Sequence, residues 1–137
     1  LETEPSELIA LDSANGNVQW RRTLASNTSV IAFLPDSNRI LISRSDQIFE
    51  INPLNNKQIQ NCPTNKFIQP FQKIVELSVG LGLICNNDTF ILADPQSMSP
   101  TWRYFKEGTR FRSCAYNGEQ LFLIEENGTI TAFKYPR

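Results

Sequence analysis

Apolar and polar residues alternate along most of the chain, in short stretches with a period of two residues. Alternation of this kind predicts β-strands, and the enrichment of these stretches in Ile, Leu, Val, Phe, Thr and Tyr supports the assignment. Helical periodicity, with apolar residues three and four positions apart, is hard to find. We therefore expect an all-β chain with strands near residues 6–12, 17–23, 29–35, 39–45, 47–52, 57–60, 73–79, 81–86, 89–94, 101–105, 110–116, 120–126 and 129–135.

Turn-forming pairs separate the predicted strands, among them Asn15-Gly16, Asn117-Gly118 and Asn127-Gly128. An Asn-Gly pair favours the positive φ values of tight hairpin turns, so we expect these pairs at the ends of hairpins. Strands that follow one another closely along a whole chain are typical of all-β domains.

The chain also contains an internal repeat of about forty residues. Two landmarks keep their spacing: a polar residue at the end of one strand, and a second residue eight positions later on the following strand. The first landmark is Asp12, Asn52, Asp94 and Lys134, in steps of 40, 42 and 40 residues. The second is Trp20, Gln60 and Trp102. About four strands in about forty residues is the size of a β-propeller blade.

We predict an all-β fold, a β-propeller segment of about three to four four-stranded blades that form an incomplete ring. The whole chain, 1–137, is one segment, with a partial blade at 6–25, blades at 28–61 and 72–106, and a partial blade at 110–136. Propellers commonly close with four to eight blades, so the open ends would expose apolar faces and strand edges. We expect the remaining blades of a larger propeller, or a second copy of the chain, to cover them.

The first repeat unit carries the fullest motif, Ala10-x-Asp12-x-x-x-Gly16-x-x-x-Trp20. This motif resembles the tryptophan-docking repeat of the quinoprotein-like (pyrroloquinoline-quinone-repeat) propellers. The later units retain parts of it, at Asn52, Asp94 and Trp102. WD-repeat propellers are the second resemblance, although their Trp-Asp and Gly-His pairs are missing from this chain.

The motif residues have structural explanations. Gly16 supplies the positive φ of a tight turn, and Asp12 accepts hydrogen bonds from the amides of that turn. Ala10 leaves room for a large neighbour. Trp20, on an outermost strand, is expected to bury its ring against the adjacent blade, and Trp102 is expected to do the same. We predict structural roles for the repeat residues, rather than contact with a ligand.

The residues that carry most enzyme chemistry are absent or scattered. The chain has no histidine, which excludes Ser-His-Asp and Cys-His pairs and histidine-based metal sites. Cys62, Cys85 and Cys114 are spaced too widely to suggest a zinc site; Cys85 falls in an apolar strand, Cys114 in another strand and Cys62 in a loop. Glu125 and Glu126 are adjacent at a strand end, where they point to opposite faces, and we expect a solvated hairpin there.

The resemblance to quinoproteins implies a quinone held by calcium, acidic ligands and an arginine, and we find no such cluster in the sequence. We therefore predict no enzyme activity, no cofactor, and no catalytic, cofactor-binding or metal-binding residues. A fragment of a quinone-dependent dehydrogenase-like propeller remains the alternative, with its ligands outside this segment.

One stretch, residues 101–112, has the composition of a binding surface. Basic residues alternate with aromatic residues there, and such a surface can stack nucleic-acid bases or anchor an acidic peptide. The candidate residues are Trp102, Arg103, Tyr104, Lys106, Arg110 and Arg112. The competing interpretation is an outermost edge strand whose charges prevent edge-to-edge aggregation.

Charge and hydropathy narrow the choice of partner. A net charge of −1 gives no overall attraction to nucleic acid or anionic lipid, and no apolar run approaches the roughly 18 residues of a membrane helix. Three sparse cysteines favour thiols in a reducing compartment, which weakly favours the cytoplasm. We predict a non-catalytic scaffold for protein–protein interaction, and a self-associating sensor or assembly domain as the alternative.

Overall fold

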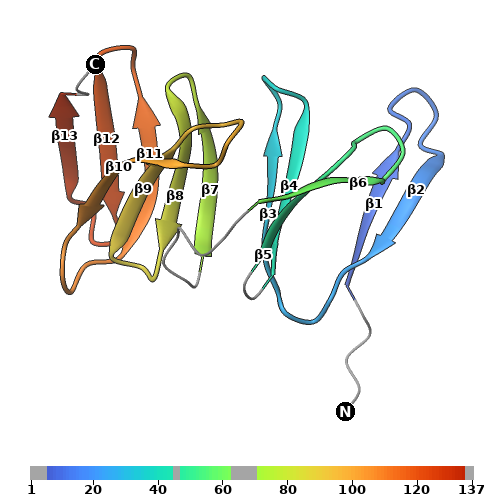
Figure 1. The fold of residues 1–137 in the computed structure, drawn as a ribbon, viewed down its shortest axis with the longest axis horizontal. Helices are drawn as coiled ribbons and strands as arrows, with labels where there is room; N and C mark the ends of the chain where they lie inside the picture. Colours follow the sequence, from blue (N-terminus) through green and yellow to red (C-terminus); the bar gives the residue numbers. More distant parts are fainter. Residues whose placement is uncertain (1–5, 45–46, 63–70, 135–137) are drawn as a thin grey trace.

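The computed structural model describes residues 6–44, 47–62 and 71–134. These residues form thirteen β-strands in four antiparallel sheets (Figure 1). The first sheet contains β1 (Glu7–Leu11) and β2 (Val18–Thr23); the second contains β3 (Thr28–Leu34), β4 (Arg39–Arg44), β5 (Gln47–Ile51) and β6 (Gln58–Cys62). The third contains β7 (Phe71–Leu77), β8 (Gly80–Cys85), β9 (Thr89–Ala93) and β10 (Pro100–Phe105), and the fourth contains β11 (Phe111–Tyr116), β12 (Gln120–Glu125) and β13 (Ile130–Lys134).

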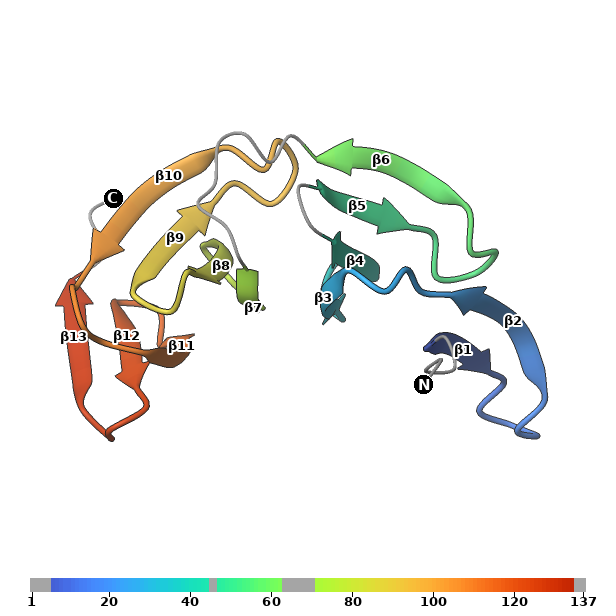
Figure 2. The same cartoon turned by 90° about the horizontal axis from the view of Figure 1, so that it is seen from below.

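The four sheets follow one another around an open arc. Figure 2 shows β3 and β7 near the middle of the arc and β6 and β10 on its outside, so that each complete sheet runs outward in chain order. This all-β, open arrangement confirms the predicted fold class. The described part of the chain contains no helix with the length and apolarity needed to cross a membrane. Residue 135 of the last predicted strand lies outside the described residues, and Cys62 ends β6 instead of lying in a loop.

The turn that follows the third strand of a blade has the same geometry three times. Its first residue accepts a hydrogen bond through its carbonyl oxygen from the amide four positions later, at 2.7, 2.9 and 2.9 Å. The side-chain oxygen of that residue accepts another from the amide two positions later, at 2.7, 2.8 and 3.0 Å. The first residues are Asp12, Asn52 and Asp94. The residues four positions later all have a positive φ: Gly16 (73°), Asn56 (62°) and Met98 (57°).

Met98 is the unusual member of this series. A positive φ is strained for methionine because its Cβ atom crowds the backbone, whereas glycine, which has no Cβ, adopts it freely. The Met98 side chain is buried among residues of the second and third sheets and is 1% exposed. Burial of a large apolar side chain stabilises the fold by about 1.5–3 kcal/mol, which is enough to offset a strained backbone of about 1–3 kcal/mol.

Three apolar cores lie between successive sheets. The core between the first and second sheets is built around Ile40, Ile42, Phe49 and Ile51. The core between the second and third sheets includes Leu34, Leu41, Ile48, Leu83 and Ile91. The core between the third and fourth sheets includes Phe90, Leu92, Cys114, Leu121 and Leu123. Each inner sheet therefore contributes one face to each of two cores, as alternation along its strands requires.

Candidate functional site

Trp20 lies between the first and second sheets. Its side chain is partly buried and packs against the core around Ile42 and Phe49. Its indole Nε1 donates a hydrogen bond of 2.8 Å to the carbonyl oxygen of Pro53, in the turn after β5. Ala10 is directly opposite Trp20 in the β1–β2 ladder, where a small side chain leaves the indole free to turn toward the second sheet.

Trp102 occupies the same place two junctions later, between the third and fourth sheets. It contacts Phe90 and Phe133 edge to face, with ring centroids 6.0 and 5.2 Å apart, and stacks on Tyr104 at 6.2 Å. Tyr104 also meets Phe133 at 4.7 Å. The aromatic rings of β10 thus form part of a core between sheets.

The structure does not bring the six candidate binding residues of 101–112 together on one face. Trp102 and Tyr104 point toward the fourth sheet, and Arg103, between them in sequence, is exposed on the opposite side of β10. Lys106 and Arg110 lie beyond the strand, in the loop to β11. The pleat of a strand sends neighbouring residues to opposite faces, and this separates the aromatic residues from the basic ones.

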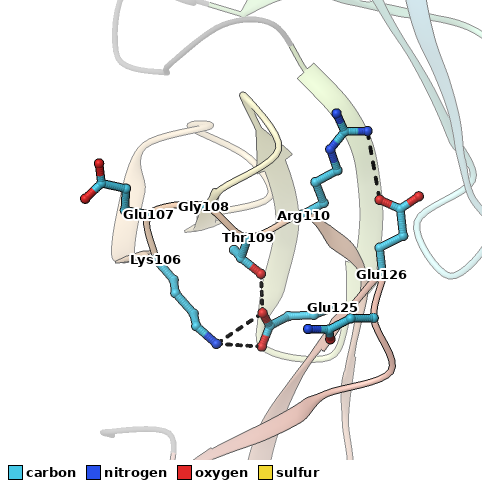
Figure 3. Close-up of a pocket in the computed structure, with 8 residues that line it drawn as sticks. Lys106, Glu107, Gly108, Thr109, Arg110, Glu125 and Glu126 are labelled. Atoms are coloured by element: carbon cyan, nitrogen blue, oxygen red, sulfur yellow. Dashed lines mark hydrogen bonds and ion pairs between the residues drawn. The ribbon is translucent and has the colours of Figure 1, made fainter.

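The basic residues of the loop border a shallow, open hollow of about 540 Å³ between the loop 106–110 and the turn after β12 (Figure 3). Arg110 and Glu126 face each other across it at 4.0 Å, and both are largely exposed. Arg112 borders an adjoining hollow with Asn87. An exposed ion pair of this kind contributes little to the stability of the fold.

Glu125 corrects the expectation of a solvated hairpin. Its side chain is 3% exposed, and its carboxylate accepts hydrogen bonds from the Thr109 hydroxyl and from Lys106 Nζ, the latter at 2.9 and 3.1 Å. These contacts, first the Thr109 hydrogen bond and then that of Lys106, hold the pKa of Glu125 below its usual value. The alternation of Leu121, Leu123 and Glu125 on one face of β12 is the sequence signal that marks Glu125 as inward-facing. Glu126 is exposed, as expected.

No three carboxylates or thiols within the described residues are close enough to hold a metal ion together. The thiols of Cys85 and Cys114 are both buried, which raises their pKa values to about 12 and keeps them protonated.

The outer face of the fourth sheet is apolar and open. Ile130 on β13 is 62% exposed, although Ile48 and Phe90, which precede it by 82 and 40 residues at equivalent places in β5 and β9, are fully buried against the next sheet. Ala132 is likewise exposed, whereas its equivalent Leu92 is buried. The open face of the fourth sheet continues across the ladder through Phe122 and Ile124, which are opposite Ala132 and Ile130.

The first sheet is open on its opposite face. Ile9 and Leu11 on β1 are 42% and 58% exposed. Their equivalents on β5, Phe49 and Ile51, are buried against the preceding sheet. The two ends of the arc therefore expose two different faces, each of which is covered wherever a neighbouring sheet is present.

Comparison with known proteins gives a fold but no relative in sequence. No model of a known protein family matches the chain, and no curated protein matches it significantly. Among solved structures the chain resembles BamB from Moraxella catarrhalis, with a TM-score of 0.62 and 10% sequence identity, over 94% of this chain and 38% of the BamB chain. It also resembles BBS1N, solved in complex with ARL6DN and soaked with mercury, with a TM-score of 0.47 and 12% identity, over 96% of this chain and 59% of that one.

The likeness to BamB, a β-propeller, confirms that the described sheets have a β-propeller-like fold. At this identity the likeness shows the fold alone. The chain spans less than two-fifths of the length of the BamB chain.

Proposed function

We propose that the chain is a non-catalytic scaffold, built from repeats of the quinoprotein-like type, that binds protein partners through its open sheet faces. The single observation that carries this proposal is the exposure of Ile130, at a position where the two preceding sheets bury Ile48 and Phe90 completely. Contiguous exposed apolar side chains on a folded domain mark interaction surfaces.

The partner that fits the open face of the fourth sheet is a β-sheet with apolar residues on its matching face. At each junction inside the arc, the face of one sheet that points toward the next sheet in chain order packs against the face of that next sheet that points back. The first sheet of a second copy offers such a facing side, with Ile9 and Leu11 exposed. We therefore expect two copies to associate head to tail, through different surfaces on each copy.

Sedimentation of the 137-residue chain over a range of concentrations tests this mode of binding. We expect reversible association, and we expect both Leu11→Lys and Ile130→Lys to weaken it, because each places a charge in the apolar junction. The matched control is Ile59→Lys, which changes an exposed isoleucine on β6, away from both open faces.

Mixing the two variants gives the sharper result. Leu11→Lys leaves the fourth sheet intact and Ile130→Lys leaves the first sheet intact, so a mixture should restore a one-to-one complex that neither variant forms alone. A chain that stays monomeric at all concentrations, or association that neither substitution affects, contradicts the proposal.

A further inference from the structure

A second, smaller hollow lies at the junction of the first and second sheets and has a different chemistry. It measures about 80 Å³, room for more than one water molecule. Arg22 of β2 borders it from the first sheet. Thr28, Arg44 and Phe49, on β3, β4 and β5, border it from the second sheet.

Two guanidinium groups lie near the same aromatic ring at this hollow. The Cζ atoms of Arg22 and Arg44 lie 5.3 and 4.8 Å from the centroid of the Phe49 ring. The ring attracts each cation, but the two like charges repel one another in a partly buried place, where screening by solvent is reduced. None of the described residues that border the hollow carries a carboxylate.

Some hydrogen-bonding groups around the hollow are not fully used by the described residues. Arg22 Nη1 donates to the main-chain and side-chain oxygens of Asn56, both at 3.0 Å, and a guanidinium has five N–H groups. Within the described part of the chain, neither Arg22 nor Arg44 forms an ion pair. The hydroxyl oxygen of Thr28 is buried and has no hydrogen-bond partner among the described residues. An unpaired buried hydroxyl costs stability unless a ligand satisfies it.

We propose that this hollow binds one oxyanion group, a phosphate or a carboxylate, between Arg22 and Arg44 with the Thr28 hydroxyl as a third donor. Planar guanidinium groups hold the oxygens of such anions through paired, charge-assisted hydrogen bonds. The anion neutralises the repulsion between the two arginines and satisfies Thr28. Because the donors belong to two sheets, the bound anion also ties the first sheet to the second and stabilises the folded chain.

Titration with inorganic phosphate, and separately with acetate, tests the site at constant ionic strength in a chloride background. The readouts are the NMR signals of the Thr28 amide and of the arginine Nε–H groups, together with the thermal midpoint. We expect saturable shifts confined to this junction. Saturation by phosphate alone assigns the site to phosphate groups, saturation by acetate alone assigns it to carboxylates, and saturation by both supports a general oxyanion site.

Variants separate specific binding from the general effect of salt. Arg44→Gln should weaken binding by about tenfold or more, because it removes a charged donor. Thr28→Val should also weaken it, whereas Thr28→Ser, which keeps the hydroxyl, should bind as the parent does. Arg21→Gln is the matched control, since Arg21 is exposed and paired with Glu7 on the other face of β2. Shifts that do not saturate with either anion, or that are equal in Arg44→Gln and the parent chain, overturn the proposal.

Discussion

The indole Nε1 of Trp20 donates a hydrogen bond to the carbonyl oxygen of Pro53, and the link recurs one repeat later with a different donor. Pro95 follows Pro53 by 42 residues, and its carbonyl oxygen accepts a hydrogen bond from Arg39 Nη1. In both cases the donor belongs to the preceding sheet. The turn after the third strand therefore closes its own hairpin and also anchors the neighbouring sheet.

Substitution of Trp20 should separate packing from this hydrogen bond. Trp20→Ala should lower the free energy of unfolding by about 3–5 kcal/mol, because it empties the junction between the first two sheets. Trp20→Phe keeps most of the apolar area and should cost less, about 0.5–1.5 kcal/mol for the lost hydrogen bond alone. Urea denaturation measures both, with the exposed Gln19→Ala as control. An unchanged transition in Trp20→Ala contradicts the packing described here.

Asp12 should contribute to stability through its turn. The carboxylate accepts a hydrogen bond from the Ala14 amide at 2.7 Å. Asp12→Ala removes that acceptor and should cost about 1–2 kcal/mol. Asp12→Asn keeps an acceptor, as Asn52 does in the second repeat unit, and should cost clearly less. Equal losses in the two variants would show that the acceptor is not the cause; denaturant unfolding provides the comparison.

Glu125 should make the folded chain sensitive to acid. Its pKa is lower in the folded state than the ordinary 4.5 expected in the unfolded chain, because Thr109 and Lys106 hydrogen-bond to the charged form. The stabilisation is therefore complete above pH 4.5 and is lost as the pH falls through the folded pKa. Glu125→Gln should reduce the fall in the free energy of unfolding between pH 6 and about pH 3. Glu126→Gln, at an exposed position, is the control and should leave this pH dependence unchanged. A pH dependence that is also unchanged in Glu125→Gln would refute the role given to Glu125.

Gly82 should be intolerant of even one added methyl group. A Cβ atom there would lie 2.7 Å from the Sγ of Cys114 and 3.1–3.2 Å from the ring of Phe90, in the core between the third and fourth sheets. Gly82→Ala should therefore cost about 1–3 kcal/mol. Cys114→Ala creates space at the same point, so the double variant should lose less than the sum of the two single variants. Simple additivity in a double-mutant cycle would place the two sites out of contact.

The strands and their grouping could be predicted because both depend on local chemistry. Period-two alternation reports which face of a strand is buried, and the spacing of Asp12, Asn52 and Asp94 reports a turn whose hydrogen bonds stay within six residues. The directions of the side chains in 101–112 do not follow from composition. Composition groups the aromatic and basic residues together, whereas the pleat of β10 sends them to opposite faces of the strand. The charge of Glu125 predicts a place in solvent, but the loop 106–110 folds over this side chain and supplies its hydrogen-bond partners.

The arginine-lined hollow had no sequence signal at all. Arg22, Thr28, Arg44 and Phe49 come from four strands in two sheets, and nothing in their spacing along the chain brings them together. Sites of this kind depend on how sheets pack, which alternation and turn chemistry do not specify.

Met98 has a consequence for how such chains diverge. Where the first turn has glycine and the second asparagine, the third turn holds the same backbone shape with a methionine whose side chain lies in the core. Selection at that position can therefore act on volume instead of on flexibility, and a lineage can exchange one for the other without altering its architecture. Repeat units that derive from one ancestral unit would then keep the same turn geometry although their sequences differ.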